Sequence, residues 1–510
     1  MEALRETLDE HDEKSVDNPV YLAVTDNVPH NLNLDLENPN NPKNTYLTPS
    51  STTELEPKVH VYKVYKRRWL ILGIFVLYSA ANALQWIQYS IIANIVQKYY
   101  GISSTLVDWT SMIYMIVYIP LIFPASWLLD KMGLRVAATL GACGTCLGAV
   151  IKCFSVSPNM FWLGFIGQST TAVSQIFILS LPARLAAVWF GPNQVSSACS
   201  IGVFGNQLGV AVGFLLPPLL VKNHDDLELI GRDLQNMFYL VAGFCGLLLL
   251  LVIFLFKAEP PTPPSAAQDK ELMYGLSNKT NSEPSNANEN SSQLESGINI
   301  EAEHSFATSV KRLLTNVGYD LLLGSYGINV GVFYALSTLL NQIVLQYYPG
   351  HEEDAGKIGL TIVLAGMLGS VVCGVVLDKT HRFKETTLAV YGFSMVGMVV
   401  YTFTLSCGYI SVVYITSGLL GFFMTGYLPV GFEFGSELTY PEPEGTSAGL
   451  LNAAAQTFGI LFTMAYAKLL DGFGDMVANL SLSFMLLVGT IMTAAIKSDL
   501  RRQKAHNLAE

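Results

Sequence analysis

Two aromatic residues at equivalent positions of the chain could hold a cation. Trp86 and Tyr334 lie 248 residues apart, and the same shift relates other parts of the sequence. The face of an aromatic ring attracts a quaternary ammonium by about 0.5–2 kcal/mol without any carboxylate. If the helices that carry Trp86 and Tyr334 face one cavity, we expect the two rings to hold an ammonium group there.

Amide side chains lie in the same kind of apolar segment as these rings. Gln175 and Gln456 are each surrounded by apolar residues, and an amide in such a place can hydrogen-bond a ligand hydroxyl. Three further amides lie close to the tryptophan in sequence: Asn82, Gln85 and Gln88. A structural role is the alternative for all of them, because buried rings pack helices together and buried amides link membrane helices.

Charged residues at the ends of the apolar segments could form latches. Asp130 and Arg135 can make charge-assisted hydrogen bonds, and Gly133 between them permits a tight turn. Asp378 and Arg382 form a weaker second copy of this pattern. We expect both copies to hold one face of the protein shut in one state. The alternative is topology, since basic residues collect on the cytosolic face of membrane proteins.

A further latch is predicted at the same face. Arg184 and its candidate partners Glu433 and Glu437 lie near the inner ends of the fourth and tenth apolar segments, which are equivalent positions in two halves of the chain. An unpaired charge at a membrane boundary costs several kcal/mol, so we expect Arg184 to pair with one of the two glutamates.

The apolar segments lack the groups that would drive active transport or catalyse a reaction. Carboxylates lie near segment ends, which disfavours a proton or sodium relay through the centre. Residues 350–357 have one residue too many between two glycines for a phosphate loop, and no Ser or Thr follows, so ATP hydrolysis is rejected. Cysteine and histidine do not cluster as metal ligands. We therefore expect no enzyme activity, no metal and no cofactor.

Membrane helices must position all of these residues. The chain has 510 residues, of which 51% are hydrophobic and 14% charged, against roughly 25% charged in soluble proteins. Its net charge of -11 argues against nucleic-acid binding, which requires a basic face. Runs of about 20 apolar residues are long enough to cross a hydrocarbon core of about 30 Å. Twelve such runs occur, at about residues 69–95, 108–129, 134–153, 160–188, 197–221, 236–256, 317–345, 358–377, 386–406, 409–432, 445–468 and 475–496.

A polar stretch divides the twelve runs into two sets of six. The predicted parts are an acidic, disordered cytosolic tail, a first six-helix half, a disordered cytosolic linker, a second half and a cytosolic tail, at residues 1–68, 69–256, 257–316, 317–496 and 497–510. Residues 94–100 return at 342–348, and Ser197 and Gly209 return 250 residues later. The sequence therefore predicts an all-α polytopic membrane protein with the major facilitator fold, two pseudo-symmetric halves with a site between them. Lys and Arg collect at one set of run ends, which places both termini in the cytosol.

Six short stretches resemble one family within that fold. They are NALQWIQYS at 82–90, PLIFP at 120–124, VWFGP at 188–192, GNQLG at 205–209, STLLNQ at 337–342 and ELTYPE at 437–442. These stretches are similar to those of the feline leukaemia virus subgroup C receptor-related transporters, and the resemblance runs over about residues 69–497.

The resemblance implies a carrier for choline and ethanolamine in the plasma membrane, or in an organellar membrane. It also implies residue roles: a tryptophan and a tyrosine that enclose the ammonium, here Trp86 and Tyr334, and two glutamines that contact the substrate head, here Gln175 and Gln456. Met115 would line the same cavity. With no coupling carboxylate, we expect a uniporter driven by the concentration gradient and by an inside-negative potential, about 2.3 kcal/mol per charge per 100 mV.

Two other functions stay open. Haem is the alternative substrate, because the family was first described as haem transporters, but all eight histidines lie in predicted tails or loops and cannot ligate iron in a central cavity. A receptor or scaffold is the third hypothesis, since Asn18-Pro19-Val20-Tyr21 matches a weak adaptor-binding pattern. The expected partners are the small-molecule substrate and the lipid bilayer.

Overall fold

The described part of the chain forms twelve long apolar helical segments. The computed structural model describes residues 21–23, 60–191, 194–264, 306–380, 382–440, 442, 444–497 and 500–501. In this part of the chain, twelve segments are long and apolar enough to cross a membrane, from Arg67–Tyr100 to Asp475–Ala495. The expected number of spans is therefore confirmed. Large apolar side chains such as Phe393 and Ile491 are exposed along the outside of the bundle, as lipid contact requires.

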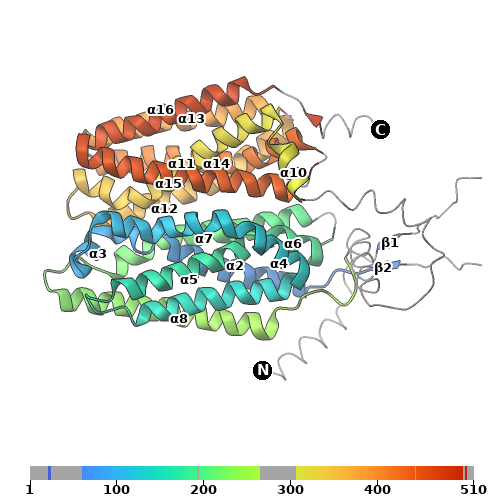
Figure 1. Ribbon diagram of the computed structural model, residues 1–510, viewed down its shortest axis with the longest axis horizontal. Coiled ribbons are helices and arrows are strands. Elements are labelled where there is room, and N and C mark those ends of the chain that lie inside the picture. Colours follow the sequence, from blue (N-terminus) through green and yellow to red (C-terminus); the bar gives the residue numbers. More distant parts are fainter. Residues whose placement is uncertain are drawn as a thin grey trace, which may run out of the picture.

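The first six spans form one half, shown in blue to green in Figure 1. Its elements are α2 (Arg67–Ile87), η1 (Ser90–Ile92), α3 (Ala93–Tyr100), α4 (Ser104–Cys153), α5 (Phe161–Leu179), α6 (Leu181–Trp189), α7 (Val195–Leu220) and α8 (Leu227–Leu255). Helix α4 contains the second and third spans, which separate at Gly133, where φ is 81°. The predicted turn at this glycine is thus confirmed, because few side chains tolerate a positive φ.

The last six spans form the other half, shown in yellow to red in Figure 1. Its elements are α11 (Val317–Tyr347), α12 (Glu352–Thr380), α13 (Phe383–Thr404), η2 (Leu405–Cys407), α14 (Ile410–Thr439), α15 (Glu444–Phe473) and α16 (Asp475–Ala495). Helix α11 is continuous, whereas its counterpart, the first span, is interrupted after α2.

The two halves meet through helices that are equivalent in the repeat. Helix α7 packs on α12, and α4 packs on α15. Because α7 and α15 are the fifth helices of their halves and α4 and α12 contain the second, these two contacts exchange under a two-fold operation. Within the halves, α2 packs on α7 as α11 packs on α15. The packing agrees with the duplication predicted from the sequence.

Glycines permit the closest of these contacts. Gly209 of α7 lies against α2, where an added Cβ would sit 2.8 Å from the carbonyl carbon of Ala80. Gly459 of α15, its partner in the repeat, lies against α11, where an added Cβ would sit 3.0 Å from a ring carbon of Tyr334. Small residues at such positions let membrane helices approach closely.

The substitution Gly209→Val is therefore expected to destabilise the first half. The obstacle is the backbone of α2, which cannot rotate away, and overpacking of this kind costs about 1–3 kcal/mol. Thermal unfolding of detergent-purified protein should show a lower melting temperature than wild type. Gly243→Val on α8 is the matched control, because nothing lies within 4 Å of a Cβ added there. Equal melting temperatures for the two variants would contradict this account of the contact.

Two of the predicted disordered segments contain short ordered elements. In the N-terminal segment, β1 (Tyr21–Ala23) pairs antiparallel with β2 (His60–Tyr62), and Tyr21 stands opposite Tyr62. In the predicted linker, α10 (Phe306–Leu313) lies beside α15. Apolar periodicity over eight residues is too short a signal to separate such a helix from polar linker sequence. The rest of the adaptor-like pattern, residues 18–20, lies outside the described residues.

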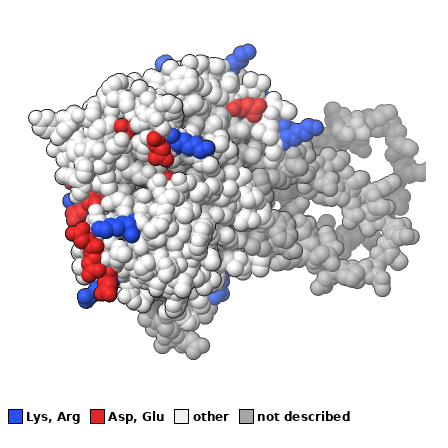
Figure 2. All heavy atoms as spheres, turned by 60° about the vertical axis from the view of Figure 1, so that its left-hand side comes forward, with Lys and Arg blue, Asp and Glu red and all other residues white. Residues whose placement is uncertain are grey.

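The bundle has two distinct ends. One end carries α3, the connection between α7 and α8 and the start of α12, and we refer to it as the α3 end. The other carries α10 and the two strands, and we refer to it as the α10 end (Figure 1). Figure 2 brings the α3 end forward and shows charged side chains gathered in a few small groups on a largely uncharged surface.

Candidate functional site

A cavity between the two halves brings four of the predicted residues together. Trp86 of α2 and Gln175 of α5 line it from the first half, and Tyr334 of α11 and Gln456 of α15 line it from the second. Its volume is about 60 Å³. A cavity needs only about 10–15 Å³ to hold one water, so this one accommodates several water molecules or a small organic group.

The two aromatic rings are in direct contact in this cavity. The ring centroids of Trp86 and Tyr334 lie 5.5 Å apart, with 77° between the ring planes, which is an edge-to-face pair. Trp86 is 6% exposed. Helix α2 ends at Ile87, the residue after Trp86, so this ring projects from the last turn of α2.

The amides predicted for the site differ in how they are held. Gln456 Nε2 donates to the hydroxyl of Tyr334 at 3.4 Å, a long hydrogen bond that links the ring to α15. Gln175 is partly buried at the cavity wall. Met115 is buried beside Gly459, where an added Cβ would lie 2.9 Å from its sulfur. Met115 is not among the residues that line the cavity, so it supports the wall rather than forming it.

Two amides of α7 were not predicted as site residues. Asn206 and Gln207 both line the cavity. Among the described residues, Asn206 Nδ2 and Gln207 Oε1 are buried and have no hydrogen-bond partner. Buried polar atoms of this kind are normally satisfied, so both are available to a ligand or to water. The available signal was two adjacent amides, at 206 and 207, inside an apolar run.

The cavity wall is uncharged. None of the described residues around it is Asp, Glu, Lys or Arg, and the polar atoms come from amides and tyrosines. Such a wall can attract a cation through ring faces and can donate or accept hydrogen bonds. It cannot neutralise a carboxylate or phosphate by ion pairing.

The other amides of the first span do not belong to this cavity. Asn82 Nδ2 donates to Thr145 Oγ1 at 2.9 Å and to Ser174 Oγ at 3.1 Å, and so joins α2 to α4 and α5. Gln85 and Gln88 face a buried lysine, described below. For these three amides the alternative interpretation, a link between helices, is correct.

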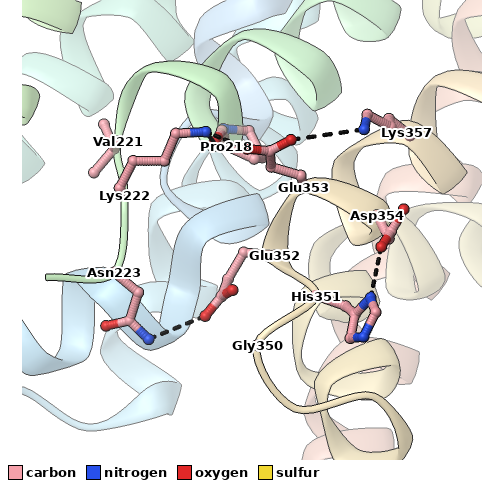
Figure 3. Close-up of a pocket in the computed structure, with 10 residues that line it drawn as sticks. All are labelled: Pro218, Val221, Lys222, Asn223, Gly350, His351, Glu352, Glu353, Asp354 and Lys357. Atoms are coloured by element: carbon pink, nitrogen blue, oxygen red, sulfur yellow. Dashed lines mark hydrogen bonds and ion pairs between the residues drawn. The ribbon is translucent and has the colours of Figure 1, made fainter.

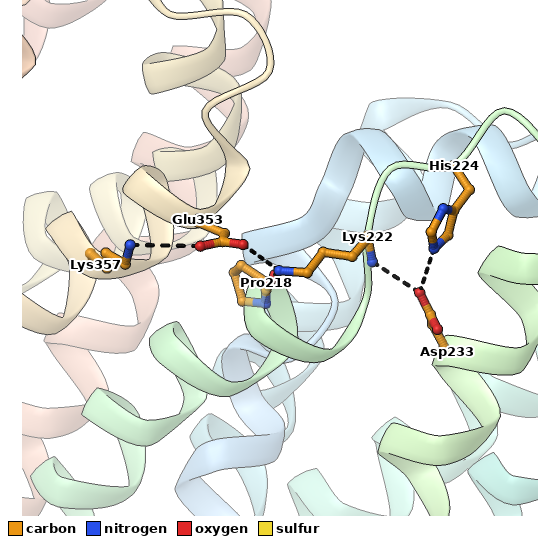
Figure 4. Close-up of polar contacts among 6 residues, drawn as sticks. All are labelled: Pro218, Lys222, His224, Asp233, Glu353 and Lys357. Carbon is orange, nitrogen blue, oxygen red and sulfur yellow. Dashed lines mark hydrogen bonds and ion pairs between the residues drawn. The ribbon is translucent and has the colours of Figure 1, made fainter.

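At the α3 end, charged and amide side chains connect the two halves. Lys222, after α7, forms an ion pair with Glu353 of α12, which also lies 3.6 Å from Lys357 (Figures 3 and 4). Glu352 accepts hydrogen bonds from Asn94 at 2.9 Å and Asn223 at 3.0 Å. A pocket of about 450 Å³ opens among these residues. The ion pair is nearly half exposed, so it contributes about 0–1 kcal/mol alone.

A second layer of contacts between the halves lies deeper and is largely buried. Gln342 Nε2 donates to Asp108 Oδ1 at 2.8 Å, and the hydroxyls of Ser111 and Thr338 are 2.8 Å apart. Asn341 Nδ2 donates to the backbone carbonyl of Ile91 at 2.8 Å. Together the two layers join the halves on the α3 side of the cavity.

The histidines of this end are engaged with carboxylates. His224 Nε2 lies 3.0 Å from Asp233, and His351 Nδ1 lies 2.6 Å from Asp354 (Figures 3 and 4). Neither lines the central cavity.

The predicted latches lie on the α10 side. Arg135 is exposed and donates to the backbone carbonyl of Ile253 at 3.1 Å. Arg382 is exposed at the start of α13. Arg184 is partly buried in α6, Glu433 is exposed and Glu437 is 6% exposed, both in α14. The side chains of the remaining two predicted latch residues lie outside the described part of the structure: Asp130 and Asp378. The pairings predicted for these residues stay predictions.

Comparison with known proteins places this architecture in a family. The chain matches the Major Facilitator Superfamily over residues 70–464. It is 52% identical over 444 residues to the choline/ethanolamine transporter flvcr2a of Danio rerio, which covers 87% of this chain and 89% of that protein. It is 50% identical over 446 residues to the choline/ethanolamine transporter FLVCR2 of Homo sapiens, over 88% of this chain and 80% of that protein.

A solved structure supports the fold independently of sequence. A bacterial homologue of the human lysosomal transporter Spinster, in an inward-facing and unoccupied conformation, aligns with a TM-score of 0.64 at 12% identity. The alignment covers 86% of this chain and 98% of that chain. The twelve spans, the repeat and these similarities all indicate the same fold. The chain belongs to the major facilitator superfamily and, within it, to the feline leukaemia virus subgroup C receptor-related transporters.

Proposed function

We propose that this transporter carries choline and ethanolamine across a membrane by facilitated uniport. The observation that carries the proposal is the uncharged cavity between the halves, which combines the rings of Trp86 and Tyr334 with amides from three helices. The relatives reported above are named for the same two substrates, which supports this choice.

The ammonium group of the substrate binds at the two rings. Because the rings of Trp86 and Tyr334 contact each other at 5.5 Å, they separate when a trimethylammonium group enters between them. The long hydrogen bond from Gln456 to Tyr334 permits this movement at little cost. Gln175 bonds the substrate hydroxyl, and the unpartnered amide atoms of α7 add donors and acceptors beside it.

The two layers at the α3 end support transport by alternating access. With both layers formed, the cavity is closed toward the α3 side, which we assign to the outside of the cell because the basic residues collect at the α10 end. Opening toward the outside breaks the contacts of Lys222 with Glu353 and of Gln342 with Asp108. The latches at the α10 end, formed by Asp130 with Arg135, Asp378 with Arg382 and Arg184 with Glu433 or Glu437, then close the cytosolic side.

One set of uptake measurements distinguishes choline transport from the two alternatives, haem transport and a scaffold role. In cells that express the chain, we expect excess ethanolamine and tetramethylammonium to compete with labelled choline, and haem to compete poorly. The reason is size: haem is at least as large as a drug-sized ligand, and such ligands occupy pockets of roughly 300–1,000 Å³, well above the volume of this cavity. Haem uptake without choline uptake would overturn the proposal. Deletion of residues 1–60 should leave transport per surface molecule unchanged, whereas a scaffold would lose its effect.

The amides of α7 are expected to recognise the hydroxyl of the substrate. Asn206→Leu and Gln207→Leu should each raise the half-saturating concentration of choline about 2–10-fold, the range of one hydrogen bond of about 0.5–1.5 kcal/mol. Tetramethylammonium has no hydroxyl, so its inhibition constant should change less. Gln235→Leu, at a partly exposed position of α8 that does not line the cavity, is the control. If the half-saturating concentration of choline and the inhibition constant of tetramethylammonium rise by the same factor, these amides do not recognise the hydroxyl.

A further inference from the structure

A lysine is buried inside the first half, outside the cavity described above. Lys152 of α4 is 1% exposed. Its Nζ donates to Gln85 Oε1 at 2.9 Å and to Gln88 Oε1 at 3.3 Å, and it lies 5.8 Å from the centre of the Tyr89 ring. Among the described residues, no carboxylate lies within ion-pair distance of this nitrogen.

An ammonium group in this position is costly. Taking a cation out of water costs several kcal/mol, and two amide oxygens and one ring offset only part of that cost. Ionisable residues inside membrane bundles are rare and usually serve a function. Two neutral side chains could link α4 to α2 without the cost, so a purely structural link does not account for the lysine.

The contacts of Lys152 lie on both sides of Trp86 in the sequence. Gln85 precedes Trp86 and Gln88 follows it by two residues, across the end of α2 at Ile87. Residues three apart lie on one face of a helix. A single ammonium group therefore hydrogen-bonds both amides and fixes the rotation of this last turn.

The side chain of another amide residue contacts the backbone of the same turn. The last carbonyls of a helix have no partner within the helix and require donors from elsewhere. Gln168 Nε2 of α5 lies 2.7 Å from the carbonyl oxygen of Gln85 and 3.4 Å from that of Trp86. The interrupted span is thus held at its break by one side chain from α4 and one from α5, at the residue that carries the ring.

We propose that Lys152 is a positioning residue for Trp86: it holds Gln85 and Gln88 so that the indole ring faces the cavity and Tyr334. This inference rests on the proposed function, since the orientation of the ring is important only if the ring binds substrate. Helix α11 is unbroken and carries Tyr334 without such support, and among the described residues a buried lysine occurs in the first half alone.

Uptake kinetics of Lys152→Met test the proposal, because methionine keeps the length of the side chain and removes the charge and the donors. We expect the half-saturating choline concentration to rise about tenfold, as when a partner that orients a binding group is lost. The maximal rate per surface molecule should stay close to wild type. The inhibition constant of tetramethylammonium should rise equally, because the affected contact is with the ammonium. Lys468→Met, at an exposed position of α15, is the control.

Combining Lys152→Met with Trp86→Phe adds a measurement that would not change if Lys152 only stabilised the fold. Phenylalanine has a smaller ring and a weaker cation–π contact, so Lys152→Met should raise the half-saturating concentration less in that background. If Lys152 only stabilises the fold, the number of active molecules falls, the half-saturating concentration stays at the wild-type value, and the proposal is overturned.

If Lys152→Met does not reach the cell surface, two milder variants test the positioning role of Lys152. Gln88→Leu removes one of the two contacts and Gln168→Leu removes the backbone donor, and each should raise the half-saturating concentration about threefold, for the loss of one hydrogen bond. Unchanged values in both would overturn the proposal. Absence of choline uptake by the wild type would remove the proposed function and this inference with it, whereas normal wild-type uptake with an unaffected Lys152→Met would overturn this inference alone.

Discussion

The variant Trp86→Ala is expected to lose most choline uptake at matched surface expression. The ring supplies half of the aromatic surface offered to the ammonium, and a desolvated cation–π contact contributes up to about 2 kcal/mol. Its removal should therefore raise the half-saturating choline concentration by about 10–30-fold. Initial rates of labelled choline uptake over a range of concentrations measure this directly.

Two companion variants separate the ring from the fold. Trp86→Phe keeps an aromatic face and should retain part of the uptake. Trp162→Ala removes a tryptophan that is 61% exposed on α5 and should transport like wild type. If Trp86→Ala reaches the surface and keeps the wild-type half-saturating concentration, the aromatic site is not where the ammonium binds.

The charge reversal Lys222→Glu is expected to slow uptake about tenfold. It places a carboxylate opposite Glu353, and like charges in contact across an interface cost several kcal/mol. The closed arrangement of the α3 end becomes less populated, so the cycle is held with that end open. The exchanged variant, with Lys222→Glu and Glu353→Lys together, restores an attractive pair and should recover most of the rate.

Accessibility of a cysteine at the deeper layer reports on the same equilibrium. Ser111 is fully buried between α4 and α11, so Ser111→Cys should react with an external, membrane-impermeant thiol reagent only when the α3 end opens. The exposed cysteines Cys143 and Cys407 are replaced by serine in this background. Faster labelling is expected with Lys222→Glu than with the exchanged variant. Equal labelling rates would show that the ion pair does not control the opening.

Hydropathy was sufficient to predict the spans, because each needs about 20 apolar residues whatever its neighbours are. The turn at Gly133 was also predictable, since a positive φ favours glycine. The break between α2 and α3 was not, because residues 88–92 contain neither proline nor glycine. It depends on donors from other helices, such as Gln168, and these are brought to the break only by the tertiary fold.

Part of the site could be predicted because the repeat marks it. Trp86 and Tyr334 occupy equivalent positions of helices that meet at the interface between the halves, so an aromatic residue at both is informative. Amides gave no such signal: Asn82 and Asn206 lie in equally apolar runs, yet one joins helices and the other faces the cavity. Hydropathy does not say which side of a membrane helix faces a cavity and which faces a neighbouring helix.

Lys152 shows the same limit for charged residues. Near the end of an apolar run, a lysine is expected to extend toward the membrane surface. Its burial is instead set by α2 and its two glutamines, which provide acceptors inside the bundle. The positions of Asn206, Gln207 and Lys152 therefore come from the structure, and the sequence supplies only their chemistry.

The most direct test of the account is choline uptake into liposomes that contain only the purified protein. Under a potassium diffusion potential of about 100 mV, inside negative and without sodium or a pH gradient, a uniporter should accumulate choline up to about 50-fold, since 2.3 kcal/mol per charge sets the equilibrium ratio. We expect this accumulation for the wild type, and a much slower accumulation for Trp86→Ala. Absence of uptake, or uptake that requires a sodium or proton gradient, would contradict it.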